Sequence, residues 1–112
     1  MYTLPLSMKS DYYKYNTILN RNDMVIGECE LNRCIFPDIH YHTYSREIYL
    51  ILEGNGFVYK GDKWIYTSVG DIHYFNPYCY HGLKTDNYIK ILYIFTRGPY
   101  KNIDYNYKKS KL

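Results

Sequence analysis

The sequence lacks long hydrophobic segments and any cysteine framework. No apolar run approaches the length of a membrane span, and Pro5 and Lys9 interrupt the first residues before a signal-like run can form. The three cysteines, Cys29, Cys34 and Cys79, are odd in number and have no CxxC spacing, which argues against a disulfide framework or a zinc ribbon. A reducing compartment suits such a chain. We therefore expect a cytoplasmic protein without a membrane-inserted segment.

The sequence also lacks a helical pattern and a strong charge of one sign. No stretch places apolar residues at i, i+3, i+4 and i+7. The formal net charge is only +3, and four lysines without an arginine carry much of the excess near residues 99–112. Such a cluster is typical of a solvated end, so the pattern does not favour nucleic-acid binding.

What the chain does have is tyrosine and short strand-like segments. There are 17 tyrosines against 4 phenylalanines and 1 tryptophan, and tyrosine favours pleated, half-buried surfaces. Turn residues close a segment about every ten residues, with tight turns expected at 53–56, 61–62 and 70–71. About seven to nine strands are expected in an all-β sandwich or barrel. The clearest strand segments are 24–31, 47–52, 57–60, 63–69, 72–75, 80–84 and 88–96.

The pattern along the chain predicts three regions. Residues 1–22 are polar and tyrosine-rich without a clear period, and are expected to form an arm that packs on the body or on a partner subunit. Residues 23–98 are expected to form one β-barrel domain, since the 112 residues are enough for a single core. Residues 99–112 are expected to form a basic C-terminal tail.

Three histidines and one acid have spacings that suit a metal site. His40 and His42 alternate along a strand and therefore point to the same side. Glu47 is an odd number of residues further on, so a bend within the polar segment 43–46 is needed to bring it to the same interior. His81 follows His42 by 39 residues (81 − 42), about right for a return through two hairpins. The array predicts a divalent transition metal as cofactor, either iron, manganese, nickel, cobalt or zinc.

The residues of this array resemble the motifs of the cupin family. Residues 40–54 match the first cupin motif, HxH-x4-E-x6-G, at every fixed position. Residues 70–81 are similar to the second motif, G-x5-P-x-G-x2-H, with its first glycine and its histidine correctly spaced. The proline is displaced by one residue to Pro77, and Tyr78 stands where the family has glycine. These departures leave the histidine in place but change the residues of the local turn.

The resemblance covers roughly residues 24–97 and implies both a fold and a ligand set. It implies a small jelly-roll barrel of two antiparallel sheets, and it implies that single-domain members commonly pair as homodimers through edge strands. One such barrel hosts many activities, so fold alone does not assign the function. The metal would be held inside the barrel by His40, His42, Glu47 and His81.

Three classes of function fit a metal with open coordination positions and a net positive charge, which attracts an oxygen-rich or anionic small molecule. The segments 47–56 and 70–77 look similar to phosphomannose-isomerase-like cupins, which favours a metal-dependent isomerase or epimerase acting on a sugar or sugar-phosphate with an α-hydroxy-carbonyl group. The second class is an iron-dependent dioxygenase or decarboxylase acting on a small organic acid. The third is a non-catalytic module that binds a metal or sugar, so the sequence leaves open whether the protein is an enzyme.

Four further residues are candidates for substrate binding. Tyr49, Tyr74 and Tyr93 are predicted as hydrogen-bond donors in the pocket, although packing within the barrel is the competing interpretation of each ring. Arg97 is predicted as an anion clamp. His73 repeats no ligand spacing and is expected to lie outside the metal site. No acid–base residue is assigned.

Overall fold

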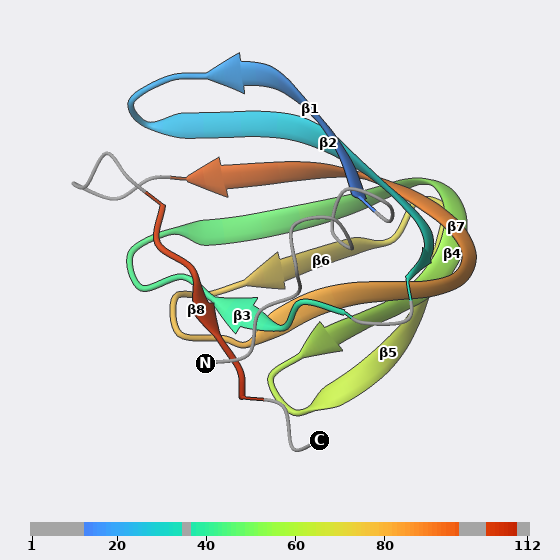
Figure 1. Cartoon of the computed structure of the whole chain (residues 1–112). Helices are drawn as coiled ribbons and strands as arrows, with labels where there is room; N and C mark the ends of the chain where they lie inside the picture. The colour runs from blue at the N-terminus through green and yellow to red at the C-terminus, as the bar shows by residue number, and fades with distance from the viewer. Residues whose placement is uncertain (1–12, 35–36, 97–102, 110–112) are drawn as a thin grey trace.

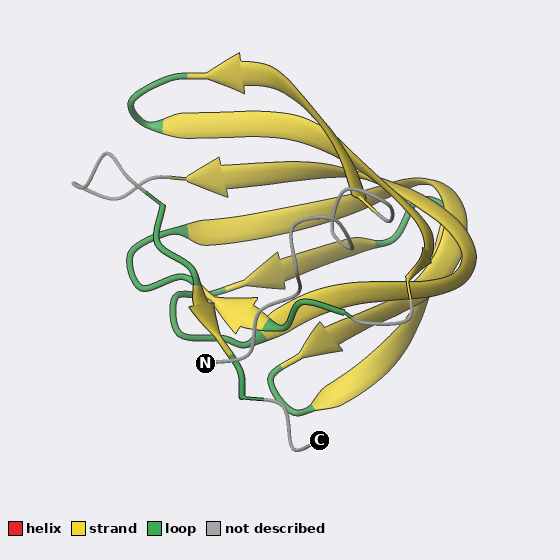
Figure 2. Ribbon diagram, in the orientation of Figure 1, coloured by secondary structure: helices red, strands yellow, loops and turns green. Residues whose placement is uncertain are grey.

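The protein is described here by a computed structural model that covers residues 13–34, 37–96 and 103–109 (Figure 1). Every regular element in these ranges is a strand, as Figure 2 shows, and none of them contains a helix able to cross a membrane. The all-β prediction is therefore confirmed. The strands are β1 (Tyr13–Asn20), β2 (Met24–Cys34), β3 (His40–Tyr41), β4 (Arg46–Lys60), β5 (Lys63–Ser68), β6 (Ile72–Phe75), β7 (His81–Thr96) and β8 (Asn106–Tyr107).

The strands form two curved layers in which every pairing is antiparallel. One layer contains β1, β2, β7, β4 and β6, and the other contains β3, β8 and β5 together with the ends of β4 and β7 (Figure 1). The long strands β4 and β7 belong to both layers, because they bend as they cross from one to the other. This bend closes the sheet around an interior, as in a barrel.

The bend of β4 corrects one expectation. Residues 53–56 were predicted as a hairpin turn, but β4 runs through them without reversing, and its register with β7 shifts there instead. Gly54 has a φ of +75° in this bulge, and a Cβ at its position would collide with the backbone carbonyl of Tyr88. A bulge and a hairpin both call for a glycine with positive φ, so the composition of the segment does not distinguish them.

Side-chain alternation directs one face of each long strand into the interior. In β4, Glu47, Tyr49 and Ile51 are buried, while the residues between them are only half-buried. The burial of each large apolar side chain contributes roughly 1.5–3 kcal/mol, so the inward rows hold the barrel together. Glu47 lies at one end of the apolar row of β4 and is thus carried into the interior with it. The inner core includes Leu31, Ile51, Val58, Phe75, Leu83, Ile89 and Ile91.

Both predicted extensions contain a strand. Within the predicted arm, β1 pairs with β2, and within the predicted tail, β8 pairs with β3. Most residues of β1 are exposed. A strand with no buried face needs no alternation of apolar and polar residues, so this pattern was not available to predict β1 from the sequence. Residues 1–12, 97–102 and 110–112 lie outside the described part of the chain. The short strand β8 proves important for the site.

Candidate metal centre

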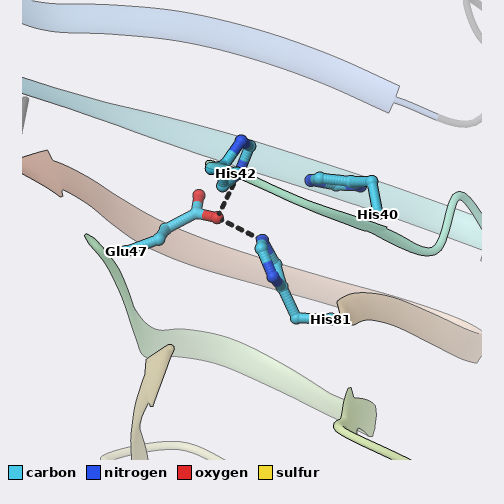
Figure 3. A group of neighbouring side chains, drawn as sticks. All are labelled: His40, His42, Glu47 and His81. Atoms are coloured by element: carbon cyan, nitrogen blue, oxygen red, sulfur yellow. Dashed lines mark hydrogen bonds and ion pairs between the residues drawn. The ribbon is translucent and has the colours of Figure 1, made fainter. Parts of the chain in front are cut away.

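The four predicted ligands come from three separate parts of the barrel. His40 lies in β3 and pairs with His81, the first residue of β7, while His42 follows β3 directly and Glu47 is the second residue of β4. The bend predicted between His42 and Glu47 is confirmed, because residues 42–45 form no strand and separate β3 from β4. Figure 3 shows the four side chains turned toward one another.

The donor atoms of these residues are close enough to surround one ion. They all lie within 4.8 Å of one another. Oε1 of Glu47 is 3.2 Å from Nε2 of His42 and 2.7 Å from Nε2 of His81. Metal–ligand bonds of about 2.0–2.2 Å place donors on opposite sides of one ion at most about 4.4 Å apart. Small side-chain rotations would therefore suffice to bring all four donors onto a common centre.

A backbone carbonyl contacts Nδ1 of each histidine in the cluster. His40 and His81 each donate from Nδ1 to the carbonyl of the residue two positions earlier, at 3.2 and 2.9 Å. His42 donates from Nδ1 to the carbonyl of Asp104 at 2.7 Å. Because a carbonyl only accepts, we assign the ring hydrogen to Nδ1 in all three residues. Each Nε2 then presents a lone pair to the interior, as a metal ligand must.

This arrangement calls for a positive charge inside the cluster. With the ring hydrogens on Nδ1, the lone pair of His81 Nε2 faces the carboxylate oxygen of Glu47 at 2.7 Å, where two acceptors repel each other unless a proton or a metal ion lies near both. Three imidazole nitrogens and one carboxylate oxygen are the donors that first-row divalent metals prefer. The residues present therefore fit a transition metal.

Burial and the contacts between the four side chains together set the charges of the cluster. Burial lowers the pKa of His40 to about 3, and repulsion from His81 and His42 acts in the same direction. For Glu47, burial alone raises the pKa, but the close contacts of its carboxylate with the rings of His42 and His81 outweigh burial and leave the pKa below its usual value. The carboxyl is thus ionised while His40 is neutral. Metal binding requires this combination, because each ligand must offer a lone pair.

Aromatic rings fix the orientations of the imidazoles. Phe75 and Phe95 are the residues that pair with Glu47 from β6 and β7. The ring of Phe75 stacks on His81 with centroids 4.5 Å apart, and Phe95 meets His42 edge-on at 4.9 Å. Sequence reasoning did not single out these two phenylalanines, although each ends the apolar run of a strand that returns beside Glu47.

The turn before His81 has Tyr78 at the position where the second motif has glycine. Tyr78 adopts a φ of +67°, in the left-handed region that glycine normally occupies. Its backbone N–H donates to the carbonyl of His42 at 2.9 Å and ties this turn to the loop that carries His42. A side chain in this region costs about 1–2 kcal/mol, which the surrounding contacts must offset.

A cavity of about 360 Å³ extends from the cluster into the barrel, with His40 and Glu47 in its wall. Its described wall combines aliphatic side chains with tyrosine rings and contains no lysine or arginine. Burial raises the pKa of Tyr49 and Tyr105 above the usual tyrosine range, so their hydroxyls remain protonated and can donate. The tyrosines of the wall are Tyr13, Tyr15, Tyr49, Tyr93, Tyr105 and Tyr107.

The candidates for substrate binding have different locations. Tyr49 and Tyr93 lie in the cavity wall. Tyr74 does not join them: because its neighbour Phe75 points inward, Tyr74 points outward, and it is 41% exposed. Arg97 lies outside the described residues. His73 is apart from the cluster, with its Nε2 2.7 Å from Oγ1 of Thr67.

Removal of a bound metal with a chelator is expected to lower the melting temperature. An ion that binds only the folded chain adds its binding free energy to stability, about 2.7 kcal/mol at 100 times its dissociation constant. For a domain of this size the shift is about 10 °C. Differential scanning calorimetry before chelation, after it and after re-addition of metal measures the effect. An unchanged melt after verified metal removal would contradict an interior metal site.

Comparison with known proteins identifies a family by sequence. The model of the cupin domain family matches residues 34–95, which is more than half of the 112 residues. This range contains all four residues of the cluster. No curated protein matches the chain.

Solved structures with the same fold are numerous but distant in sequence. An uncharacterized conserved protein with a double-stranded β-helix domain from Klebsiella pneumoniae has a TM-score of 0.74 and 16% identity, with 87% of this chain and 86% of that chain covered. KdgF from Halomonas sp. has a TM-score of 0.71 and 15% identity, with 78% and 80% covered. A predicted oxalate decarboxylase from Thermotoga maritima has a TM-score of 0.69 and 18% identity, with 76% and 80% covered. At these identities the likeness shows the fold alone.

Proposed function

This chain belongs to the cupin domain family, and we propose that it is a metal-dependent isomerase or epimerase of a small sugar-like compound with an α-hydroxy-carbonyl group. One observation carries the proposal. The cluster of three histidines and Glu47 lies at the wall of a cavity lined by tyrosines, so a ligand in the cavity can reach the open coordination positions of the ion. A fully enclosed structural metal would have no such access.

The cavity wall supports a neutral substrate. Phosphate groups are usually bound by arginine, lysine or helix N-termini, and the described wall contains no arginine or lysine. Tyrosine offers an apolar ring face for the C–H groups of a sugar and a hydroxyl for its oxygens. An unphosphorylated sugar or a related polyol with a carbonyl group therefore suits this cavity better than a sugar-phosphate.

The residues of the site have separate tasks in this proposal. His40, His42, Glu47 and His81 would hold the metal, which supplies Lewis acidity toward the carbonyl and hydroxyl oxygens of the substrate when it is bound. The protonated hydroxyls of the wall tyrosines would orient the remaining oxygens of the substrate. The aliphatic and aromatic side chains of the wall would limit the access of water.

The apolar part of the wall also favours a second candidate. An iron-dependent dioxygenase or decarboxylase of a small organic acid combines a histidine–carboxylate iron site that has open positions with a cavity from which water is largely excluded. Both features are compatible with this structure. This candidate is distinguished from an isomerase by its requirement for iron and by the fate of oxygen. The apolar residues of the wall include Val25, Leu83, Ile91 and Phe95.

The two activities are separable in one experiment. Metal-free protein is loaded with Mn²⁺ or Zn²⁺ under argon and incubated in D₂O with matched sugars and sugar-phosphates. An isomerase that forms an enediolate exchanges the hydrogen on the α-carbon for deuterium, and NMR detects this exchange; we expect it with the unphosphorylated sugars. In parallel, iron-loaded protein is given small organic acids while oxygen uptake and release of carbon dioxide are recorded.

Two tyrosine variants provide a matched control. Tyr49→Phe removes a hydroxyl from the cavity, and a lost hydrogen bond of about 1 kcal/mol would raise KM roughly fivefold. Tyr74→Phe removes the same group from the outer side of β6 and should leave KM unchanged. Oxygen uptake or carbon dioxide release without deuterium exchange would favour the second candidate, and a lack of any turnover would indicate a binding module.

A further inference from the structure

Residues 103–109 pack against the histidines of the metal centre. Strand β8 pairs with β3, so that Tyr107 lies opposite His40. The segment is also held beyond this pair: the backbone N–H of Lys108 donates to the carbonyl of Ile39 at 2.8 Å, and its ammonium group donates to the hydroxyl of Tyr59 at 2.6 Å. Figure 1 shows β8 beside β3 at this end of the barrel. The segment is thus part of the site and not a solvated tail.

Asp104 makes the main contacts between this segment and the loop that carries His42. Its carboxylate accepts hydrogen bonds from the backbone N–H of Thr43 at 2.9 Å and from the hydroxyl of the same residue. The amide nitrogen of Asn106 donates to this carboxylate at 2.9 Å, so the carboxylate is held from a second side. Its backbone carbonyl accepts from Nδ1 of His42 at 2.7 Å. One residue therefore contacts both His42 and its neighbour in the chain.

The three histidines of the cluster differ in where the carbonyl that accepts from Nδ1 lies in the chain. His40 and His81 use carbonyls two residues earlier in their own segments, which the local backbone supplies. The partner of His42 lies 62 residues further along the chain. The orientation of His42 thus depends on a tertiary contact, whereas local backbone fixes the other two rings.

Tyr105 adds a steric component to this contact. Its ring centroid is 4.8 Å from that of His42, which it meets at an interplanar angle of 83°, and 5.1 Å from that of His40. Phe95 meets His42 on an edge as well, at 4.9 Å. Two aromatic rings and a carbonyl together restrict the rotation of the His42 imidazole.

We propose that Asp104 is a positioning residue of the metal centre, which fixes the tautomer and the orientation of His42 from outside the two cupin motifs. The inference rests on the metal site of the proposed function but not on the reaction catalysed there. The carboxylate holds the loop at Thr43, and the carbonyl then receives the Nδ1 hydrogen and leaves Nε2 directed at Glu47 and the ion. Partners of this kind typically change metal affinity 10- to 100-fold.

The test compares Asp104→Ala and Asp104→Asn with Asp62→Ala, which removes an exposed carboxylate from the turn between β4 and β5. Each full-length protein is freed of metal and titrated with Co²⁺, whose visible absorption reports the geometry of its ligands. We expect Asp104→Ala to bind Co²⁺ 10- to 100-fold more weakly and with an altered spectrum. Asp104→Asn should weaken Co²⁺ binding less than Asp104→Ala, because its amide oxygen can still accept a hydrogen bond from the backbone N–H of Thr43. Asp62→Ala should have the Co²⁺ affinity and the visible spectrum of the wild type.

A second readout uses protein without metal. Long-range ¹⁵N–¹H spectra of the imidazoles report which nitrogens carry hydrogen, and Nδ1 of His42 should be fully protonated in the wild type but only partly protonated in Asp104→Ala. Loss of stability alone would change neither this protonation nor the Co²⁺ spectrum. If Asp104→Ala does not fold, Asp104→Asn and Thr43→Val provide the same comparison.

The outcomes separate this inference from the function proposed above. Folded Asp104 variants with wild-type affinity, spectrum and tautomer would overturn the role of Asp104 and leave the metal centre intact. A wild-type protein that binds no Co²⁺ would overturn both. If the Asp104 variants lose affinity as expected and no isomerase activity is found, only the assigned reaction is wrong.

Discussion

Replacement of His42 by alanine is expected to weaken metal binding at least about 100-fold. The substitution removes a direct ligand, and the loss of a hydrogen-bond partner of a ligand already costs 10- to 100-fold. His42 is buried, with 1% of its surface exposed. A side chain from the surface could replace it as a metal ligand only if the interior rearranged. Elemental analysis of the purified variant and a Zn²⁺ competition titration would measure the effect.

His73→Ala is the matched control for this substitution. It removes the same imidazole from a half-buried position in β6, where Nε2 bonds to the hydroxyl of Thr67, and His73 is not part of the cluster. Its metal content should equal that of the wild type. Wild-type metal content in His42→Ala would show that His42 is not a ligand, and equal losses in the two variants would point to a general loss of folding.

Replacement of Gly54 by alanine is expected to reduce the free energy of unfolding by more than about 3 kcal/mol. The φ of +75° alone costs a side chain about 1–2 kcal/mol. In addition, the new Cβ would collide with the carbonyl of Tyr88 and lie 3.1 Å from Cα of Ile89, both in the backbone of β7. This backbone cannot retreat without breaking its pairing with β4. Urea denaturation of the metal-free proteins would measure the loss.

Gly61→Ala separates the two contributions at Gly54. Gly61 has a similar φ of +71° in the turn between β4 and β5, but no atom lies within 4 Å of the position its Cβ would take. Gly61→Ala should therefore reduce the free energy of unfolding only by the cost of a side chain at positive φ, about 1 kcal/mol. Equal losses in the two variants would contradict the importance of the close approach between β4 and β7.

The sequence was sufficient to predict the strand character of the barrel and the common side of His40 and His42. Alternation of side chains depends on local backbone geometry, so it can be recognised without knowledge of the partner strand. The same local information was insufficient at Gly54, where the path of β4 depends on its shift in pairing from β6 to β5. For this reason a bulge within one strand was interpreted as a turn between two.

The contribution of Asp104 and Tyr105 to the site could not be predicted from sequence. Both residues approach His42 only after β8 pairs with β3, and no pattern connects positions 62 residues apart. Tyr74 lies outside the described cavity wall for a simpler reason: Phe75, the next residue of β6, points inward, so Tyr74 points outward. The predicted homodimer stays a prediction.

The position of β7 has a consequence for how the chain folds. This strand pairs with β2, β3 and β4, and its last residue, Thr96, is opposite Met24, 72 positions earlier (96 − 24). Assembly thus awaits contacts between remote segments, and topologies of this kind typically fold in milliseconds to seconds. Until β7 docks, the edges of β2 and β4 expose N–H and C=O groups that can form hydrogen bonds with other chains. Refolding yield should consequently decrease as protein concentration rises.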